Sequence, residues 1–165
     1  PGIDFSAGSL GQGVSAACGM ALAGKLGHKD YRVYTILGDG EIEEGQVWEA
    51  AMFADHYKLD NLCFIIDNND LQIDGRVGEV SSPYPIDEKF RAFGFEVFCC
   101  DGHDFAALEE TFQKVLKVTG KPAAIIAKTI KGKGVSYMED QVGWHGKAPN
   151  DAEYEQGMKE LEEVR

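Results

Sequence analysis

An aspartate and a pair of amides are the residues of this sequence best placed to do chemistry. Asp39 lies within Leu37–Gly40, and Asn68–Asn69 follow after a gap of 27 residues. Each group comes directly after an apolar run rich in β-forming residues, Val33–Leu37 and Leu62–Asp67. Ligands of open α/β sheets bind at the carboxyl ends of the strands. The pattern therefore predicts a ligand site built from two strand ends.

The chemistry of these groups favours a metal-bound phosphate. The gap has room for one helix and one strand, a single crossover that brings the two strand ends together. Asp39 offers a carboxylate oxygen, Asn69 an amide oxygen and Leu71 a backbone carbonyl. Three oxygen donors suit Mg²⁺, whose other positions go to phosphate oxygens and water. Gly38 and Gly40 have no Cβ, so the backbone there can approach a phosphate.

Three motifs together identify a family. Gly-Asp-Gly followed at this distance by Asn-Asn resembles the thiamine-diphosphate motif. Gly8–Gly13, with the sequence GSLGQG, and Trp144–Pro149, with WHGKAP, are similar to transketolase and occur in that family's order. The resemblance covers nearly the whole chain. Ser9 stands where the family has proline, a departure that affects the local backbone but leaves Leu10 in place.

The resemblance also implies roles for individual residues. The implied cofactor contacts are Gly8, Ser9, Leu10, Gly38, Gly40, Asn69 and His145, and the implied metal ligands are Asp39, Asn69 and the Leu71 carbonyl. His145 is the implied catalytic residue, which reaches the diphosphate and the sugar and assists proton transfer. The alternatives are that Asp39 only caps a helix and that His145 is a surface histidine. Asn68 is expected to be a turn residue.

Other residues are open between two interpretations. Ile73 and Ile130 resemble apolar positions that flank the cofactor, but core packing explains them equally well. His103 resembles the family only as part of a strand-to-helix turn. Lys131 and Lys133 face either a phosphate or solvent.

The acids after the metal motif, Glu43, Glu44 and Glu49, are expected near a subunit contact. Glu44 matches a family position that is hydrogen-bonded to the catalytic glutamate of the partner. A salt-bridged surface helix is the alternative. Val47, Trp48 and Ala51 are expected to form an apolar patch at this contact.

The hydrophobic pattern predicts alternating strands and helices. The expected strands are 33–37, 62–67, 95–99 and 123–129, and the expected helices are 9–25, 44–57, 86–93, 106–118 and 151–164. This order predicts an α/β fold, a parallel β-sheet flanked by helices on both faces. Residues 131–150 are expected to form a glycine-rich loop, and Asp151 to be the N-cap of the last helix. Residues 1–165 are expected to form one diphosphate-binding domain that lacks its amino-terminal part.

Composition excludes several classes of function. The net charge is −12, from 16 basic and 28 acidic residues, which argues against a nucleic-acid partner. No apolar run approaches the ~20 residues of a membrane span, and no secretory signal is visible, although an upstream targeting segment is left open. The four cysteines include no Cys-x-x-Cys pair, so free thiols and a reducing, cytoplasmic compartment are expected.

The implied function is that of the cofactor-binding half of a transketolase, resembling the amino-terminal subunit of split transketolases. The implied cofactors are thiamine diphosphate and Mg²⁺, with Ca²⁺ or Mn²⁺ as substitutes. The implied reaction moves a two-carbon ketol unit from a ketose phosphate to an aldose phosphate. The implied partner, in a homo- or hetero-oligomer, is a pyrimidine-binding domain or a carboxy-terminal subunit. Two alternatives are a 1-deoxyxylulose-5-phosphate synthase-like enzyme and a catalytically silent cofactor-binding subunit.

Overall fold

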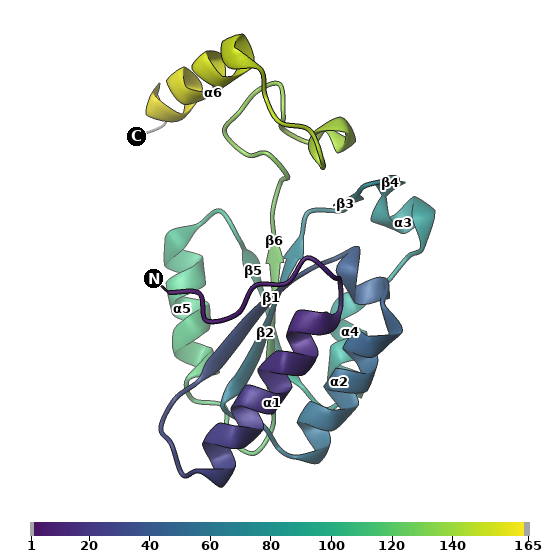
Figure 1. Cartoon of the computed structure of the whole chain (residues 1–165). Helices are drawn as coiled ribbons and strands as arrows, with labels where there is room; N and C mark the ends of the chain where they lie inside the picture. The colour runs from purple at the N-terminus through teal and green to yellow at the C-terminus, as the bar shows by residue number, and fades with distance from the viewer. Residues whose placement is uncertain (1, 164–165) are drawn as a thin grey trace.

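A four-stranded parallel sheet forms the centre of the molecule (Figure 1). The computed structural model describes residues 2–163. The strands are β1 (Val33–Gly38), β2 (Leu62–Asn68), β5 (Glu96–Asp101) and β6 (Ala123–Lys128), in the spatial order β1-β2-β6-β5. Because every pair is parallel, all four carboxyl ends lie at one edge of the sheet.

Helices cover both faces of this sheet, which confirms the predicted fold class. The longer helices are α1 (Gln12–Leu26), α2 (Gly45–His56), α4 (Ile86–Ala92), α5 (Phe105–Val115) and α6 (Asp151–Glu163). Short turns of helix are η1 (Glu41–Glu43), α3 (Val77–Val80) and η2 (Val142–Trp144). The predicted helix and strand bounds hold to within a few residues, and Val164 lies outside the described residues.

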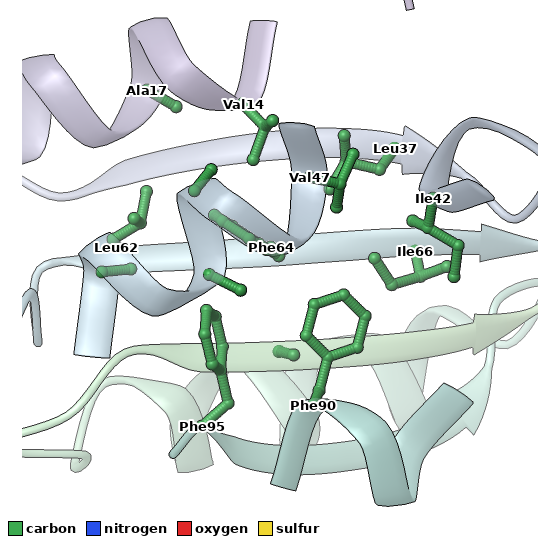
Figure 2. Close-up of a cluster of buried hydrophobic side chains, with 14 of the residues drawn as sticks. Val14, Ala17, Leu37, Ile42, Val47, Leu62, Phe64, Ile66, Phe90 and Phe95 are labelled. Atoms are coloured by element: carbon green, nitrogen blue, oxygen red, sulfur yellow. The ribbon is translucent and has the colours of Figure 1, made fainter. Parts of the chain in front are cut away.

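One face of the sheet carries the larger core, where α1, α2 and α4 pack on the strands (Figure 2). Phe64 of β2 is fully buried there, with its ring centroid 5.0 Å from that of Phe95 and 6.1 Å from that of Phe90. Val47 and Ala51 of α2 are also fully buried in this core. The expectation that they form a surface patch was therefore wrong, because both side chains pack inside the chain's own core.

The opposite face is covered by α5. Val115 and Phe112 pack there against alternate residues of β2 and β6, such as Cys63 and Ile125. All four cysteines are free, as expected, and burial raises the pKa of the Cys18 and Cys63 thiols to about 12. No helix among residues 2–163 is long and apolar enough to cross a bilayer.

A small hairpin follows β2 and was not predicted. Its strands β3 (Leu71–Gln72) and β4 (Gly75–Arg76) have two residues each and pair antiparallel. Strands this short give no alternating pattern in the sequence, so the stretch is recognisable only as polar. The hairpin lies next to the carboxyl edge of the sheet (Figure 1).

Residues 131–163, called here the C-terminal segment, extend beyond that edge (Figure 1). They hold themselves together. Ser136 donates to Glu160 from both its backbone nitrogen and its hydroxyl, and the Tyr137 hydroxyl donates to the Glu153 carbonyl. Asn150 and Glu153 each accept the other's backbone N–H at the start of α6, at 3.0 and 2.8 Å. Asn150, rather than the expected Asp151, therefore caps this helix.

Candidate functional site

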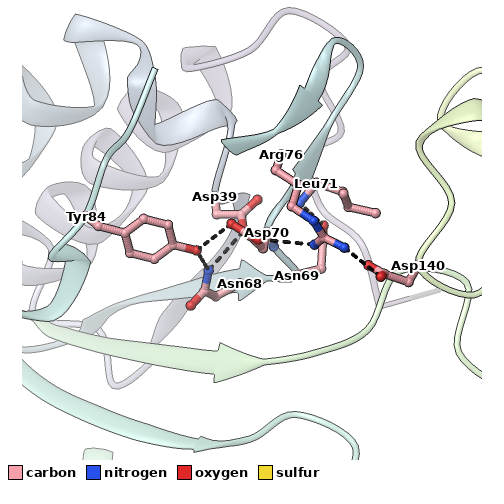
Figure 3. Close-up of polar contacts among 8 residues, drawn as sticks. All are labelled: Asp39, Asn68, Asn69, Asp70, Leu71, Arg76, Tyr84 and Asp140. Carbon is pink, nitrogen blue, oxygen red and sulfur yellow. Dashed lines mark hydrogen bonds and ion pairs between the residues drawn. The ribbon is translucent and has the colours of Figure 1, made fainter. Parts of the chain in front are cut away.

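Asp39 follows the last residue of β1 and is held from both strand ends (Figure 3). Its side chain is buried, at 1% exposure. One carboxylate oxygen, Oδ1, accepts the Gly40 N–H at 3.0 Å. The other, Oδ2, accepts the Asn68 amide at 2.9 Å and the Asp70 N–H at 2.5 Å. The predicted meeting of the two strand ends is thus confirmed.

The electrostatics of Asp39 fit a bound cation. Among the described residues, no lysine, arginine or histidine forms an ion pair with it. Burial raises the pKa of the Asp39 carboxyl, while hydrogen bonds from Asn68, Asp70 and Gly40 oppose that rise. A buried carboxylate without a positive partner is costly, and a divalent cation would remove that cost. The residues present therefore fit the predicted metal.

The other two predicted ligands lie on the same loop. Asn69 is half-buried, and its Oδ1 accepts the Leu71 N–H at 3.0 Å. Leu71 is the first residue of β3, and its side chain is buried, which is compatible with the predicted ligation through its backbone carbonyl. No three His, Cys, Asp or Glu side chains within residues 2–163 gather as a metal cluster, which a site with one carboxylate does not need. The shared ligation of a metal by Asp39, Asn69 and Leu71 stays a prediction.

Asn68 has a role that the sequence reasoning missed. Its amide donates to Asp39 Oδ2 and to the Tyr84 hydroxyl, both at 2.9 Å, so it is more than a turn residue. The strand register could have revealed this. Gly38 pairs with Asp67, so the residues that follow them, Asp39 and Asn68, leave the sheet side by side.

Glu41 brings the first two motifs together. Its carboxylate accepts the Gly11 N–H at 2.9 Å and the Gly38 N–H at 3.2 Å. Gly11 has a φ of 77°, a left-handed conformation that favours glycine. The predicted cofactor residues just before it, Gly8, Ser9 and Leu10, are exposed. Only Gly11, which follows them, is hydrogen-bonded to Glu41, and the contact of Gly8, Ser9 and Leu10 with a cofactor stays a prediction.

The two glycines beside Asp39 differ in what surrounds them. A Cβ on Gly40 would lie 2.9 Å from the Gln72 Cβ, so the fold itself requires glycine there. A Cβ on Gly38 would meet Glu41 atoms only at 3.8 Å, an ordinary contact. The packing around position 38 therefore does not require glycine, and the approach of a phosphate there stays a prediction.

The third motif is not joined to the first two. His145 follows η2 in the C-terminal segment, its side chain is exposed, and its N–H donates to the Val142 carbonyl at 2.9 Å. Beside it, Trp144 packs against Tyr137 and Lys147, at 5.1 Å between ring centroids and 3.9 Å from the ammonium. No hydrogen bond or ion pair within residues 2–163 connects His145 with Asp39 or Asn69.

The acids near α2 are only partly explained. Glu44 and Glu49 are exposed in this chain, and Glu43 accepts the Gln72 amide at 3.2 Å. Trp48 packs on Phe90 inside the chain, with ring centroids 5.0 Å apart. The exposed surface of α2 therefore includes apolar side chains, such as Met52, as well as the acids.

Three further predictions can be placed. His103 lies between β5 and α5, as expected for a strand-to-helix turn, and its Nε2 accepts the Ile130 N–H at 2.7 Å. Ile73 and Ile130 are 65% and 39% exposed, so core packing was the wrong alternative for both. Lys133 pairs with Glu139 at 3.2 Å.

A cavity of about 910 Å³ opens at the same edge of the sheet. Its lining includes Asn68, Tyr84, His103, Ile130 and Lys133. Asp39, Asn69 and His145 are not part of the lining, so the cavity adjoins the candidate metal site without containing it.

Fold and site together define an α/β protein whose candidate site lies at the carboxyl edge of a parallel sheet, the edge at which such sheets bind ligands. Comparison with known proteins agrees. Residues 1–162 match the family model of the transketolase, thiamine diphosphate binding domain. The chain belongs to this family.

The matches to individual relatives include almost all of this chain but only part of each relative's length. The 6-deoxy-6-sulfo-D-fructose transketolase subunit of Clostridium sp. (strain MSTE9) is 44% identical over 161 residues, which are 98% of this chain and 58% of that protein. An apulose-4-phosphate transketolase subunit from Phocaeicola vulgatus is 43% identical over 163 residues, 99% of this chain and 58% of that protein. The crystal structure of Campylobacter jejuni transketolase superposes with a TM-score of 0.91 at 33% identity, over 98% of this chain and 26% of that one. The chain thus spans somewhat over half the length of these two curated relatives.

Proposed function

We propose that this chain is the cofactor-binding half of a transketolase, acting as one diphosphate-binding domain with a pyrimidine-binding partner. The observation that carries the proposal is the buried Asp39 carboxylate, which has no cationic partner among residues 2–163 and lies in a chain of this family. Asp39, Asn69 and the Leu71 carbonyl would hold Mg²⁺ with the diphosphate. Gly8, Ser9, Leu10, Gly38 and Gly40 would line the cofactor.

The residues of this chain would bind and orient the cofactor and the substrate, while thiamine diphosphate, when bound, supplies the carbon nucleophile. The three donors around Asp39 fix its carboxylate before the metal arrives, which lowers the cost of ordering on binding. His145 would hold or move a proton at the sugar once the C-terminal segment lies over the site. Sugar phosphates are the proposed substrates, and the cytoplasm the proposed compartment.

Two features favour this function over its rivals. The segments Gly8–Gly13 and Trp144–Pro149 speak against a 1-deoxyxylulose-5-phosphate synthase-like enzyme, which shares only the metal motif. Intact Asp39, Asn69 and His145 speak against a silent cofactor-binding subunit. The two subunit relatives are named for different sugars, 6-deoxy-6-sulfo-D-fructose and apulose 4-phosphate, so they leave the sugar pair of this chain open.

Reconstitution tests the proposal. The full chain is assayed for ketol transfer with Mg²⁺ and thiamine diphosphate, alone and with a pyrimidine-binding transketolase subunit. We expect no turnover alone, because the partner supplies a catalytic glutamate, and turnover with the partner. His145→Gln should lower that turnover by about 10²–10⁴-fold, the usual contribution of a general acid–base. Turnover by the chain alone, or an assembled enzyme without transfer to any aldose phosphate, would refute the proposal.

A further inference from the structure

The C-terminal segment is tied to the rest of the described chain by one polar contact. Arg76 Nη2 on β4 pairs with Asp140 Oδ2 at 2.7 Å. Within residues 2–163, no other hydrogen bond or ion pair joins residues 131–163 to residues 2–129. The segment that carries His145 thus meets the hairpin next to the metal motif at a single guanidinium.

The same guanidinium also contacts the loop Asn68–Leu71, which donates hydrogen bonds to Asp39 (Figure 3). Arg76 Nη1 pairs with Asp70 Oδ2 at 3.2 Å, and the Tyr84 hydroxyl donates to Asp70 Oδ1 at 3.2 Å. The Asp70 backbone N–H donates to Asp39 Oδ2 at 2.5 Å. An unbroken series of contacts therefore runs from Asp39 through Asp70 and Arg76 to Asp140.

Both aspartates that pair with Arg76 have an unusual backbone conformation. Asp70 and Asp140 have φ values of 64° and 56°, in the left-handed region that few residues other than glycine adopt. Aspartate tolerates this region because its short side chain bonds locally. A planar guanidinium can contact two carboxylates at once with fixed geometry, which a lysine ammonium cannot reproduce.

Global stability does not account for this arrangement. The side chains of Arg76, Asp70 and Asp140 are 44%, 40% and 50% exposed. Exposed ion pairs contribute little to folding stability. Such a contact can still decide the position of the C-terminal segment, because no other polar contact in the described part of the chain attaches this segment to residues 2–129.

We propose that Arg76 is a positioning residue that couples the loop Asn68–Leu71 to the C-terminal segment, so that filling the Asp39 site orders the segment bearing His145. This inference rests on the proposed function, because it takes Mg²⁺ and thiamine diphosphate as the ligands of that loop. Arg76 is not proposed to contact the cofactor or the sugar. It acts by holding Asp140.

Hydrogen exchange of the full chain, assembled with its partner subunit, tests the coupling. In the unaltered chain, adding Mg²⁺ and thiamine diphosphate should slow exchange in residues 68–71 and also in residues 131–145. In Arg76→Gln, the ligands should still slow exchange in residues 68–71. The slowing in residues 131–145 should be smaller by about fivefold or more, the lower end of the range for coupling between sites. Unchanged exchange in β2 and β6 would show that the variant is folded.

Three further variants sharpen the test. Arg91→Gln is the matched control, since Arg91 is 49% exposed and pairs with Asp87 at 3.7 Å within α4, and it should keep both responses. Asp140→Asn should reproduce Arg76→Gln, and the double variant should lose no more than either alone.

Each remaining outcome has a distinct meaning. A response at residues 131–145 that survives Arg76→Gln, or that Arg91→Gln removes equally, overturns the coupling alone. Absence of any response at residues 68–71 in the unaltered chain overturns the proposed function and the coupling with it.

Discussion

The loop around Asp39 and the segment around His145 carry predicted functional residues, yet they are built in opposite ways. Asp39 is buried and accepts three hydrogen bonds from two strand ends. His145 is exposed, and the segment around it bonds mainly to itself. One site is fixed by the sheet, while the other meets the body of the chain through the Arg76–Asp140 pair.

This difference suggests a division of labour. A metal site benefits from rigid ligands, because ordering them on binding costs free energy. His145 is proposed to act on an incoming sugar, and such a residue must leave the substrate a way in, a purpose that loops able to open and close commonly serve. The comparison therefore predicts that the two regions respond very differently to substitution.

The largest difference is expected in stability. Phe64→Ala should cost about 3–5 kcal/mol of unfolding free energy, because Phe64 is fully buried between Phe90 and Phe95. Leu161→Ala on α6, at a side chain 44% exposed, should cost about 1 kcal/mol or less. Denaturant melts of both variants measure this. Equal losses would show that the C-terminal segment shares the main core after all.

A smaller effect is expected at the outer contact of the metal site. Asn68→Ala removes the amide that donates to Asp39, so Mg²⁺ affinity in the presence of thiamine diphosphate should fall about 10–100-fold. Tyr84→Phe is the matched control, since it removes one hydroxyl but leaves the Asn68–Asp39 bond intact. Titration of Mg²⁺ into both variants measures the difference. Full affinity in Asn68→Ala would mean that Asp39 needs no support from β2.

Much of the fixed region could be predicted from sequence. Apolar β-rich runs mark β1 and β2, and the residues after them must lie at one sheet edge, which placed Asp39 beside Asn68–Asn69. Which residues of the two strand ends face each other depends on the register between β1 and β2, and the sequence of one strand does not reveal that register. Asn68 was therefore predicted to be a turn residue, although it faces Asp39.

The other region resisted prediction for physical reasons. The two-residue strands of the hairpin leave no periodic signal, so Arg76 had no assigned place. Its partners Asp70 and Asp140 lie 6 and 64 positions away along the chain, and no local rule links residues so far apart. Trp48 showed the converse error. An apolar side chain beside acids was interpreted as an interface, but α4 of the same chain covers it.

Binding of thiamine diphosphate as a function of Mg²⁺ is the most direct test of the account. It compares the unaltered chain with Asp39→Asn, each assembled with the partner subunit, by titration calorimetry. Asn keeps the size of Asp39 but removes its charge, and its NH2 group cannot accept the N–H bonds that one carboxylate oxygen receives. We predict Mg²⁺-dependent binding in the unaltered chain and a loss of more than about 100-fold in Asp39→Asn, or about 2.8 kcal/mol. Equal affinity in the two proteins, or binding indifferent to Mg²⁺, would contradict the central claim that Asp39 holds the metal of the cofactor.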